Sequence, residues 1–176
     1  MEIRLSQRLN DILEYAREEA MRTGCRAISA DHLALGILRD TDNDACRAMA
    51  DLGIDLAGMK SFIDAVFEGN GTVPFGDSDK ISVTRSAQSA INMATMEALK
   101  SEQTEVSPAH LILAISRIQG SASRQFLENA GVSTDSLFSH LKEKGLLLNA
   151  TRTVTPSPQD FMHIINIPNI STKTLS

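Results

Sequence analysis

The chain has few of the residues that mark disulfide-stabilised, nucleic-acid-binding or membrane-spanning proteins. Its 176 residues contain no tryptophan, one tyrosine and two cysteines. Cys25 and Cys46 form no CxxC motif, which excludes a disulfide framework and a structural zinc site. The net charge is −5 and no basic block interrupts it, so nucleic acid is not an expected partner. No apolar run approaches the ~20 residues of a membrane helix, and we expect no membrane contact.

Motifs of common enzyme classes are also missing. The sequence has no GxxxxGK[ST] loop, no GxGxxG after a predicted strand and no HExxH. The four histidines, at 32, 110, 140 and 163, do not have the spacing of metal ligands. These absences predict a protein that is not an enzyme and holds no cofactor and no metal. The N-terminus lacks the pattern of a signal peptide, which predicts a cytoplasmic protein.

What the sequence does contain is typical of a helical protein. Hydrophobic residues make up 42% of the chain, and seven of them are methionine. β-Branched residues do not alternate in the runs that mark strands until the last part of the chain. The composition therefore predicts an all-α protein with a core large enough for one domain.

An internal repeat organises this chain. Ser29, His32 and Arg39 recur 78 residues later as Ser107, His110 and Arg117, with Leu and Ile matching between them. The same offset holds from about residue 7 to about residue 63, which is the mark of a tandem duplication. We predict repeat one over residues 5–67, a linker over 68–82 and repeat two over 83–145.

Each repeat predicts four helices. The first has apolar residues at the 3.6-residue period after a capping residue, Ser6 in repeat one and Thr84 in repeat two. The second begins at Ser29 or Ser107 and is apolar all round, as expected of a central helix. The third and fourth are shorter and end near glycines, at positions 53, 69, 131 and 145. The predicted fold is an eight-helix bundle with pseudo-twofold symmetry.

The ends of this domain are marked by changes in composition. The linker is rich in Gly, Asp and Ser and predicts a loop. After a domain over residues 1–148, residues 149–176 are rich in Thr, Ser, Pro and Asn, and prolines exclude a long helix there. This non-helical tail is either flexible or an extended segment that docks on its own domain, a partner's groove or a sheet edge.

Two positions near the start of the second helix of each repeat are informative. His32 and His110 are expected to tie the helix start to a neighbouring loop, since no carboxylate or metal ligand is specified nearby. Asp31 either stabilises the helix dipole or, with the free N–H groups of a helix start, forms a site for a ligand that carries both charges. Ala109 stands at the equivalent position and has no carboxylate, so we expect the two halves to differ.

The repeated Ser-x-[Asp/Ala]-His-Leu-x-Leu-[Gly/Ala]-Ile string, the preceding Ala-x-x-Glu-Ala and the Leu-Gly-Ile-Asp at 52–55 resemble the N-terminal domain of Clp ATPases, of the ClpC and ClpA type. The resemblance covers about residues 5–145. It implies a compact pseudo-twofold bundle of eight helices. It also implies a module that recruits substrates and adaptors to an unfoldase ring, which feeds a ClpP-type protease.

The resemblance also implies binding residues. ClpC-type domains bind phosphorylated arginine at two equivalent sites, which carries over by position to Leu5, Ser6 and Asp31 in repeat one and to Val83, Thr84 and Ala109 in repeat two. The family's glutamate is an aspartate at 31 and is missing at 109. These departures favour a shallow groove for peptides or an adaptor helix over phosphoarginine binding.

No ATPase motif follows the two repeats. The leading hypothesis is a non-catalytic protein-binding module that acts with a Clp ATPase, a ClpP-type protease, or Clp substrates and adaptors. Two alternatives stay open, namely an N-terminal fragment of a longer Clp ATPase and a stand-alone scaffold or sensor that reuses the fold.

Overall fold

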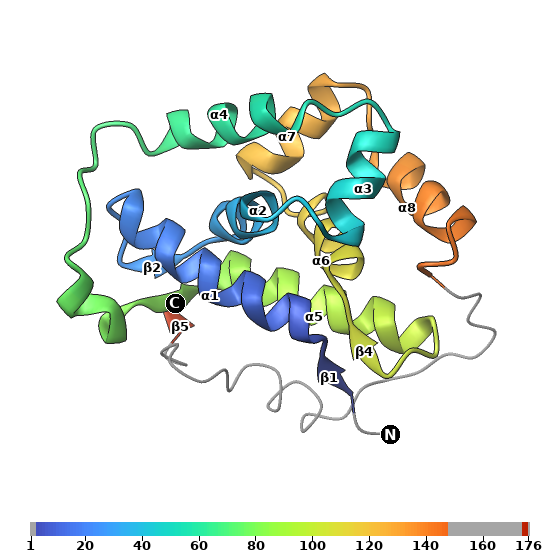
Figure 1. Cartoon of the computed structure of the whole chain (residues 1–176), viewed down its shortest axis with the longest axis horizontal. Helices are drawn as coiled ribbons and strands as arrows, with labels where there is room; N and C mark the ends of the chain where they lie inside the picture. Colours follow the sequence, from blue (N-terminus) through green and yellow to red (C-terminus); the bar gives the residue numbers. More distant parts are fainter. Residues whose placement is uncertain (1–2, 148–173, 176) are drawn as a thin grey trace.

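The computed structural model describes residues 3–147 and 174–175, and within them it confirms the predicted all-α bundle of eight helices (Figure 1). Repeat one supplies α1 (Gln7–Arg22), α2 (Ala30–Arg39), α3 (Asp44–Asp51) and α4 (Leu56–Val66). Repeat two supplies α5 (Arg85–Lys100), α6 (Pro108–Ile115), α7 (Ala122–Asn129) and α8 (Thr134–Glu143). Helices α1 and α5, and likewise α3 and α7, begin and end at positions related by the repeat offset.

Side-chain caps explain where these helices begin. The hydroxyl of Ser6 accepts a hydrogen bond from the backbone N–H of Leu9, and that of Thr84 accepts one from Ala87. Asn43 and Ser121 cap α3 and α7 in the same way. Each cap satisfies one of the N–H groups that a helix start leaves without an intrahelical partner.

Helices α2 and α6 occupy the centre of the molecule, as their apolar composition predicts. Leu35 on α2 and Ile115 on α6 are 1% and 0% exposed. Gly36 lets α1 and α2 pack closely, because a Cβ added there would lie 2.6 Å from the carbonyl oxygen of Ile12. Burial of these central helices by the outer ones supplies one continuous hydrophobic core.

Short strands connect the two repeats in a crossed arrangement. They are β1 (Arg4–Leu5), β2 (Ala27–Ile28), β3 (Ser82–Thr84), β4 (Glu105–Val106) and β5 (Thr174–Leu175). β1 of repeat one pairs in parallel with β4 of repeat two, and β2 pairs in parallel with β3, whose other edge pairs with β5. Helices cross over as well, since α3 packs against α6 and α7 against α2. The repeats are therefore interlocked, and neither forms its strand pairs without the other.

The linker differs from its prediction. It contains a short 3₁₀ helix, η1 (Phe75–Lys80), where the composition predicted only a loop. Pro74 precedes it with φ −59°, and the carbonyl of Pro74 accepts a hydrogen bond from the N–H of Asp77. A proline fixes the φ that such a turn requires. The Gly, Asp and Ser content of the linker indicated a loop and did not indicate this 3₁₀ turn.

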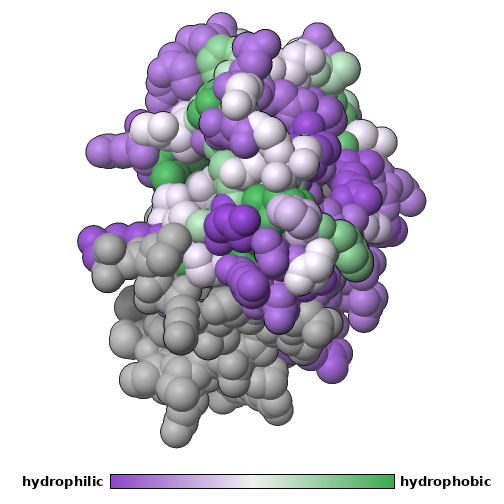
Figure 2. All heavy atoms as spheres, turned by 90° about the vertical axis from the view of Figure 1, so that its left-hand side faces the viewer, coloured by the Kyte–Doolittle hydropathy of each residue, from purple (hydrophilic) through white to green (hydrophobic). Residues whose placement is uncertain are grey.

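The predicted tail over 149–176 lies outside the described residues except for β5. Seen from the side that carries the α4–η1 connection, hydrophobic residues reach the surface in small groups between hydrophilic ones (Figure 2). Among the described residues, no helix is both long and apolar enough to cross a membrane.

Candidate binding site

The start of α2 meets the start of α7, and Asp31 joins them. One carboxylate oxygen, Oδ1, accepts hydrogen bonds from the backbone N–H of Ser123 at 2.9 Å and from its hydroxyl at 2.7 Å. The other, Oδ2, accepts from the N–H of Ala122 at 3.1 Å. Asp31 thus lies on one helix and satisfies the first turn of another, where a negative charge is also favoured by the helix dipole.

The opposite junction joins the starts of α6 and α3, and here the carboxylate comes from Asp44. Burial raises the pKa of the Asp44 carboxyl above its usual range, while hydrogen bonding to the backbone of Ala109 and the hydroxyl of Ser107 opposes that rise. Its Oδ1 is buried and has no hydrogen-bond partner. The carboxylate is therefore less fully satisfied at this junction than at the other.

The two junctions take their carboxylate from non-equivalent helices. Asp31 corresponds to Ala109 by the repeat offset, and Asp44 corresponds to Ala122. In one junction α2 supplies the acid and α7 the alanine, and in the other α3 supplies the acid and α6 the alanine. The halves do differ, as expected, but Ala109 does not leave its junction without a carboxylate. Asp44 was not among the predicted site residues, and the offset that pairs it with Ala122 was the signal that could have found it.

The residues at the strand ends are grouped differently from the prediction. We expected Leu5 and Ser6 beside Asp31, and Val83 and Thr84 beside Ala109. The strand pairs reverse this, since β3 with Val83 and Thr84 lies next to β2, which leads into α2. The N–H of Ala30 donates to the hydroxyl of Ser86, just after Thr84. The reason is that strands of one repeat pair with strands of the other, and the sequence of a single repeat does not predict this pairing.

Leu5 and Ser6 lie at the other junction. The backbone N–H of Ser6 donates to the carbonyl of Val106 at 2.9 Å, and β1 pairs with β4 immediately before α6. The hydroxyls of Ser6 and Thr84 both serve as helix caps. Each junction therefore combines a strand end from one repeat with a helix start from the other.

His32 and His110 lie one turn inside these helix starts and have matching roles. The N–H of Ser29 donates to Nδ1 of His32 at 3.0 Å, and the N–H of Ser107 donates to Nδ1 of His110 at 2.9 Å. Since Nδ1 accepts, Nε2 carries the proton and donates to Thr23 in one half and to Gln103 at 2.6 Å in the other. Burial lowers the pKa of both histidines to about 4, so both are neutral at pH 7.

A cavity of about 500 Å³ lies beside the Asp31 junction. Asp31 and the α7 start form part of its wall, and α4 contributes Phe62 and Val66. Arg124 also lines it, with its Nε 2.8 Å from a carboxylate oxygen of Glu128. The cavity thus combines an apolar wall from α4 with a polar wall from Asp31 and the α7 start.

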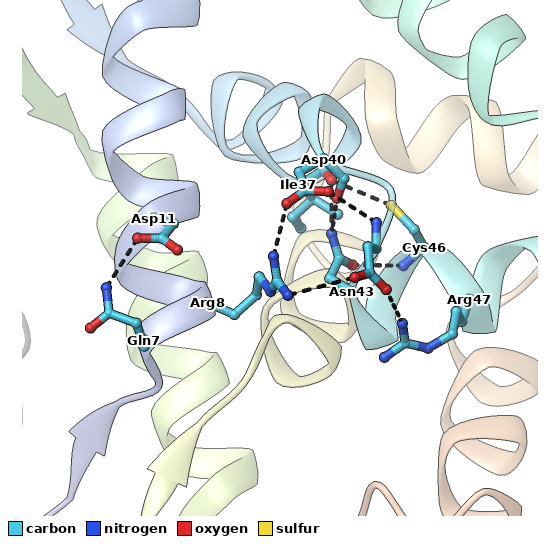
Figure 3. Close-up of polar contacts among 9 residues, drawn as sticks. Gln7, Arg8, Asp11, Ile37, Asp40, Asn43, Cys46 and Arg47 are labelled. Atoms are coloured by element: carbon cyan, nitrogen blue, oxygen red, sulfur yellow. Dashed lines mark hydrogen bonds and ion pairs between the residues drawn. The ribbon is translucent and has the colours of Figure 1, made fainter.

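A polar cluster fixes the turn between α2 and α3, just before Asp44 (Figure 3). The side-chain N–H groups of Asn43 donate to the carbonyls of Ile37 at 3.0 Å and Asp40 at 2.6 Å. Arg8 reaches from α1 to the carboxylate of Asp40 at 2.8 Å. Burial raises the pKa of the Cys46 thiol to about 11, so this cysteine is a packing residue with an unreactive thiol.

No metal site accompanies these junctions. Within residues 3–147 and 174–175, no group of three or more His, Cys, Asp or Glu side chains could hold a metal ion. The polar groups at the junctions instead form hydrogen bonds between helix starts.

Comparison with known proteins gives a consistent result. The chain matches the family described as the Clp repeat (R) N-terminal domain over residues 4–130 and again over 82–158. It is 27% identical over 130 residues to the chaperone protein ClpB of Oceanobacillus iheyensis. It is 28% identical over 130 residues to the negative regulator of genetic competence ClpC/MecB of Bacillus subtilis. Each match covers 74% of this chain but only 16% of the relative.

Solved structures share the fold. The N-terminal domain of ClpD from Arabidopsis thaliana superposes with a TM-score of 0.60 at 14% identity, over 80% of this chain and 96% of that one. The Hsp104 N-terminal domain from Candida albicans gives 0.66 at 12% identity, over 85% and 99%.

Proposed function

Because the chain belongs to the family of Clp repeat N-terminal domains, we propose that it is a non-catalytic protein-binding module that recruits substrates or adaptors in Clp-dependent proteolysis. Its partners under this proposal are a Clp ATPase, a ClpP-type protease, or Clp substrates and adaptors. The observation that carries the proposal is the presence of two Clp repeats folded into one interlocked body.

The chemistry of the junctions supports binding over catalysis. His32 and His110 are neutral at pH 7 and committed to helix starts, so neither is poised to transfer a proton. Asp31 is already held by three hydrogen bonds. The proposal also keeps the protein in the cytoplasm, where free thiols such as Cys25 and Cys46 stay reduced.

The proposed binding residues fall into two groups that follow the crossed strands. One group is Asp31 with Val83 and Thr84, and the other is Leu5 with Ser6. In the first group, Oδ2 of Asp31 accepts one hydrogen bond, from Ala122, and has a lone pair for a guanidinium or amide of a ligand in the neighbouring cavity. In the second group β1 pairs only with β4 among the described strands and can present its other edge to an extended peptide, whereas β3 of the first group is already paired with β2 and β5.

One further possibility follows from length. The chain spans 16% of the length of the ClpB and ClpC relatives it matches. In an alternative to independent action, the same module works as the N-terminal part of a longer Clp ATPase.

The test uses the full chain, immobilised and exposed to lysate from its own source, with bound proteins identified by mass spectrometry. We expect enrichment of a Clp ATPase or of ClpP subunits, followed by saturable binding when the purified ATPase is titrated against the chain. Capture of a different defined partner, with no binding of either purified Clp component, would contradict the proposal. An immobilised Asp31→Asn variant measures the contribution of the charge at that junction.

A further inference from the structure

Helix α4 is apolar on two of its faces. Met59 and Ile63 point into the core and are fully buried. Phe62 and Val66, one turn apart on another face, are 37% and 57% exposed. They are two of the three large hydrophobic side chains that the described residues leave exposed, and the exposed Ala65 lies between them. An amphipathic helix normally presents polar residues on its outer face, so this second apolar stripe needs an explanation.

The repeat provides an internal comparison. Helix α8 stands at the equivalent position in repeat two, and there Phe62, Ala65 and Val66 correspond to His140, Glu143 and Lys144. His140 and Lys144 lie 3.2 and 4.0 Å from the carboxylate of Asp51. The same surface position is thus polar and ion-paired in one half and apolar in the other. The fold itself does not require the apolar stripe.

The stripe borders the cavity described above. Helices α4 and α7 lie side by side along the top of the molecule (Figure 1). Phe62 packs on Phe126 of α7, with ring centroids 5.6 Å apart. On the α7 wall Arg124 pairs with Glu128, whereas Asp31 is held only by uncharged donors of the α7 start. A ligand here meets apolar side chains and amides, with the carboxylate of Asp31 at the edge of the cavity.

We propose that the apolar stripe of α4 and the adjacent cavity dock an amphipathic helix from another protein. The spacing of Phe62, Ala65 and Val66 matches the i, i+3, i+4 pattern by which one helix face packs against another. The docked face carries uncharged aliphatic or aromatic side chains. Asp31 of the first strand-end group lines the same cavity, so the inference rests on the proposed function there, and it adds the α4 stripe, which the peptide experiment tests without any Clp component.

A single helix fits this surface better than a second copy of the chain. Helix α4 has 11 residues and is about 16 Å long. A stable homodimer buries roughly 800 Å² on each partner. Three apolar side chains on one short helix provide less than that, whereas they are sufficient to anchor one partner helix in the neighbouring cavity.

The experiment uses the full chain and a synthetic probe. The probe is a capped helical peptide of about 16 residues, with Leu at i, i+3, i+4 and i+7 and Ala and Gln elsewhere. Its control is a peptide of the same composition with the Leu spacing scrambled. Binding is measured by fluorescence anisotropy, and ¹H–¹⁵N NMR spectra of the chain locate the bound peptide. We expect shifts centred on α4 and α7 with the patterned peptide and none with the scrambled one.

Variants copied from the second repeat give the sharpest control. Val66→Lys and Phe62→His place the equivalent residues of the second repeat on α4, and we expect each to raise the Kd by about tenfold. Val66→Lys should leave thermal unfolding unchanged, whereas Phe62→His also loses the packing on Phe126 and should lower the unfolding midpoint. Lys144→Ala on α8 is the matched control and should leave the Kd unchanged. Equal Kd values for the chain and for Val66→Lys, or shifts centred away from α4 and α7, would overturn the proposal. So would a doubling of the chain's mass in solution that Val66→Lys abolishes, because the stripe would then be a contact between copies.

Discussion

Removing the carboxylate of Asp31 is the most direct test of the α2–α7 junction. In Asp31→Ala the backbone N–H groups of Ala122 and Ser123 and the Ser123 hydroxyl lose their acceptor. Ser123 is fully buried, so water does not readily replace the carboxylate there. An unsatisfied buried donor costs about 1–3 kcal/mol, and loss of a helix cap about 1 kcal/mol. We expect the free energy of unfolding to fall by about 2–3 kcal/mol.

The measurement is urea unfolding at pH 7, followed by circular dichroism, together with the thermal midpoint. For a chain of this size the expected loss lowers the midpoint by about 5–10 °C. Asp135→Ala is a suitable control, because Asp135 lies in the first turn of α8 and is exposed. We expect that control to cost less than about 1 kcal/mol. If Asp31→Ala costs no more than Asp135→Ala, the junction does not stabilise the fold as argued.

The exchanged carboxylates allow a second step of the same test. Ala109→Asp alone places a second carboxylate beside Asp44 and should be destabilising, because two like charges then share one buried junction. In an Asp44→Ala background, A109D restores a single carboxylate and reproduces the arrangement of the other half. We expect a coupling energy of about 1–2 kcal/mol between the two changes. Strictly additive effects would show that the two positions do not share a junction.

Three further predictions concern stability. Between pH 6.5 and 4 the unfolded chain protonates His32 and His110 while the folded chain does not, so the free energy of unfolding should fall by about 3 kcal/mol per histidine as the pH decreases. His110→Gln should remove the contribution of one histidine to this pH dependence, measured by urea unfolding at several pH values. Asp44→Asn should raise the unfolding free energy at pH 7, and the gain should shrink as the pH falls through the raised pKa of Asp44, since protonation then relieves the same cost. Leu35→Asp should abolish cooperative thermal unfolding, because it buries an unpaired charge at a site that is 1% exposed.

The sequence predicted the helices well because their signals are local. Hydrophobic period, capping residues and helix-ending glycines all lie within a few residues of the boundary they specify. The repeat doubled each signal, which is why Ser6 and Thr84 are both found at helix starts. The buried positions of Leu35 and Ile115 follow from the same pattern.

The sequence could not predict contacts that cross between repeats. The pairing of β1 with β4 and of β2 with β3 depends on how the two halves dock, and strands of two or three residues carry almost no pattern of their own. The partner of Asp31 lies about 90 residues away, so its role in capping α7 was not visible from α2 alone. Apolar character alone also did not separate the buried Ile63 of the fourth helix from Val66, which the structure leaves 57% exposed.

The crossed arrangement makes separate evolution of the two halves possible within one stable body. Each junction has one carboxylate at a meeting of two helix starts, and the two junctions take it from non-equivalent helices, as Asp31 and Asp44 show. Other equivalent positions differ as well. The outer face of α4 carries Phe62 and Val66 where α8 carries His140 and Lys144. Duplication therefore supplies a core of matching helices, and the differences between equivalent surface positions are the places to test for a role of one half alone.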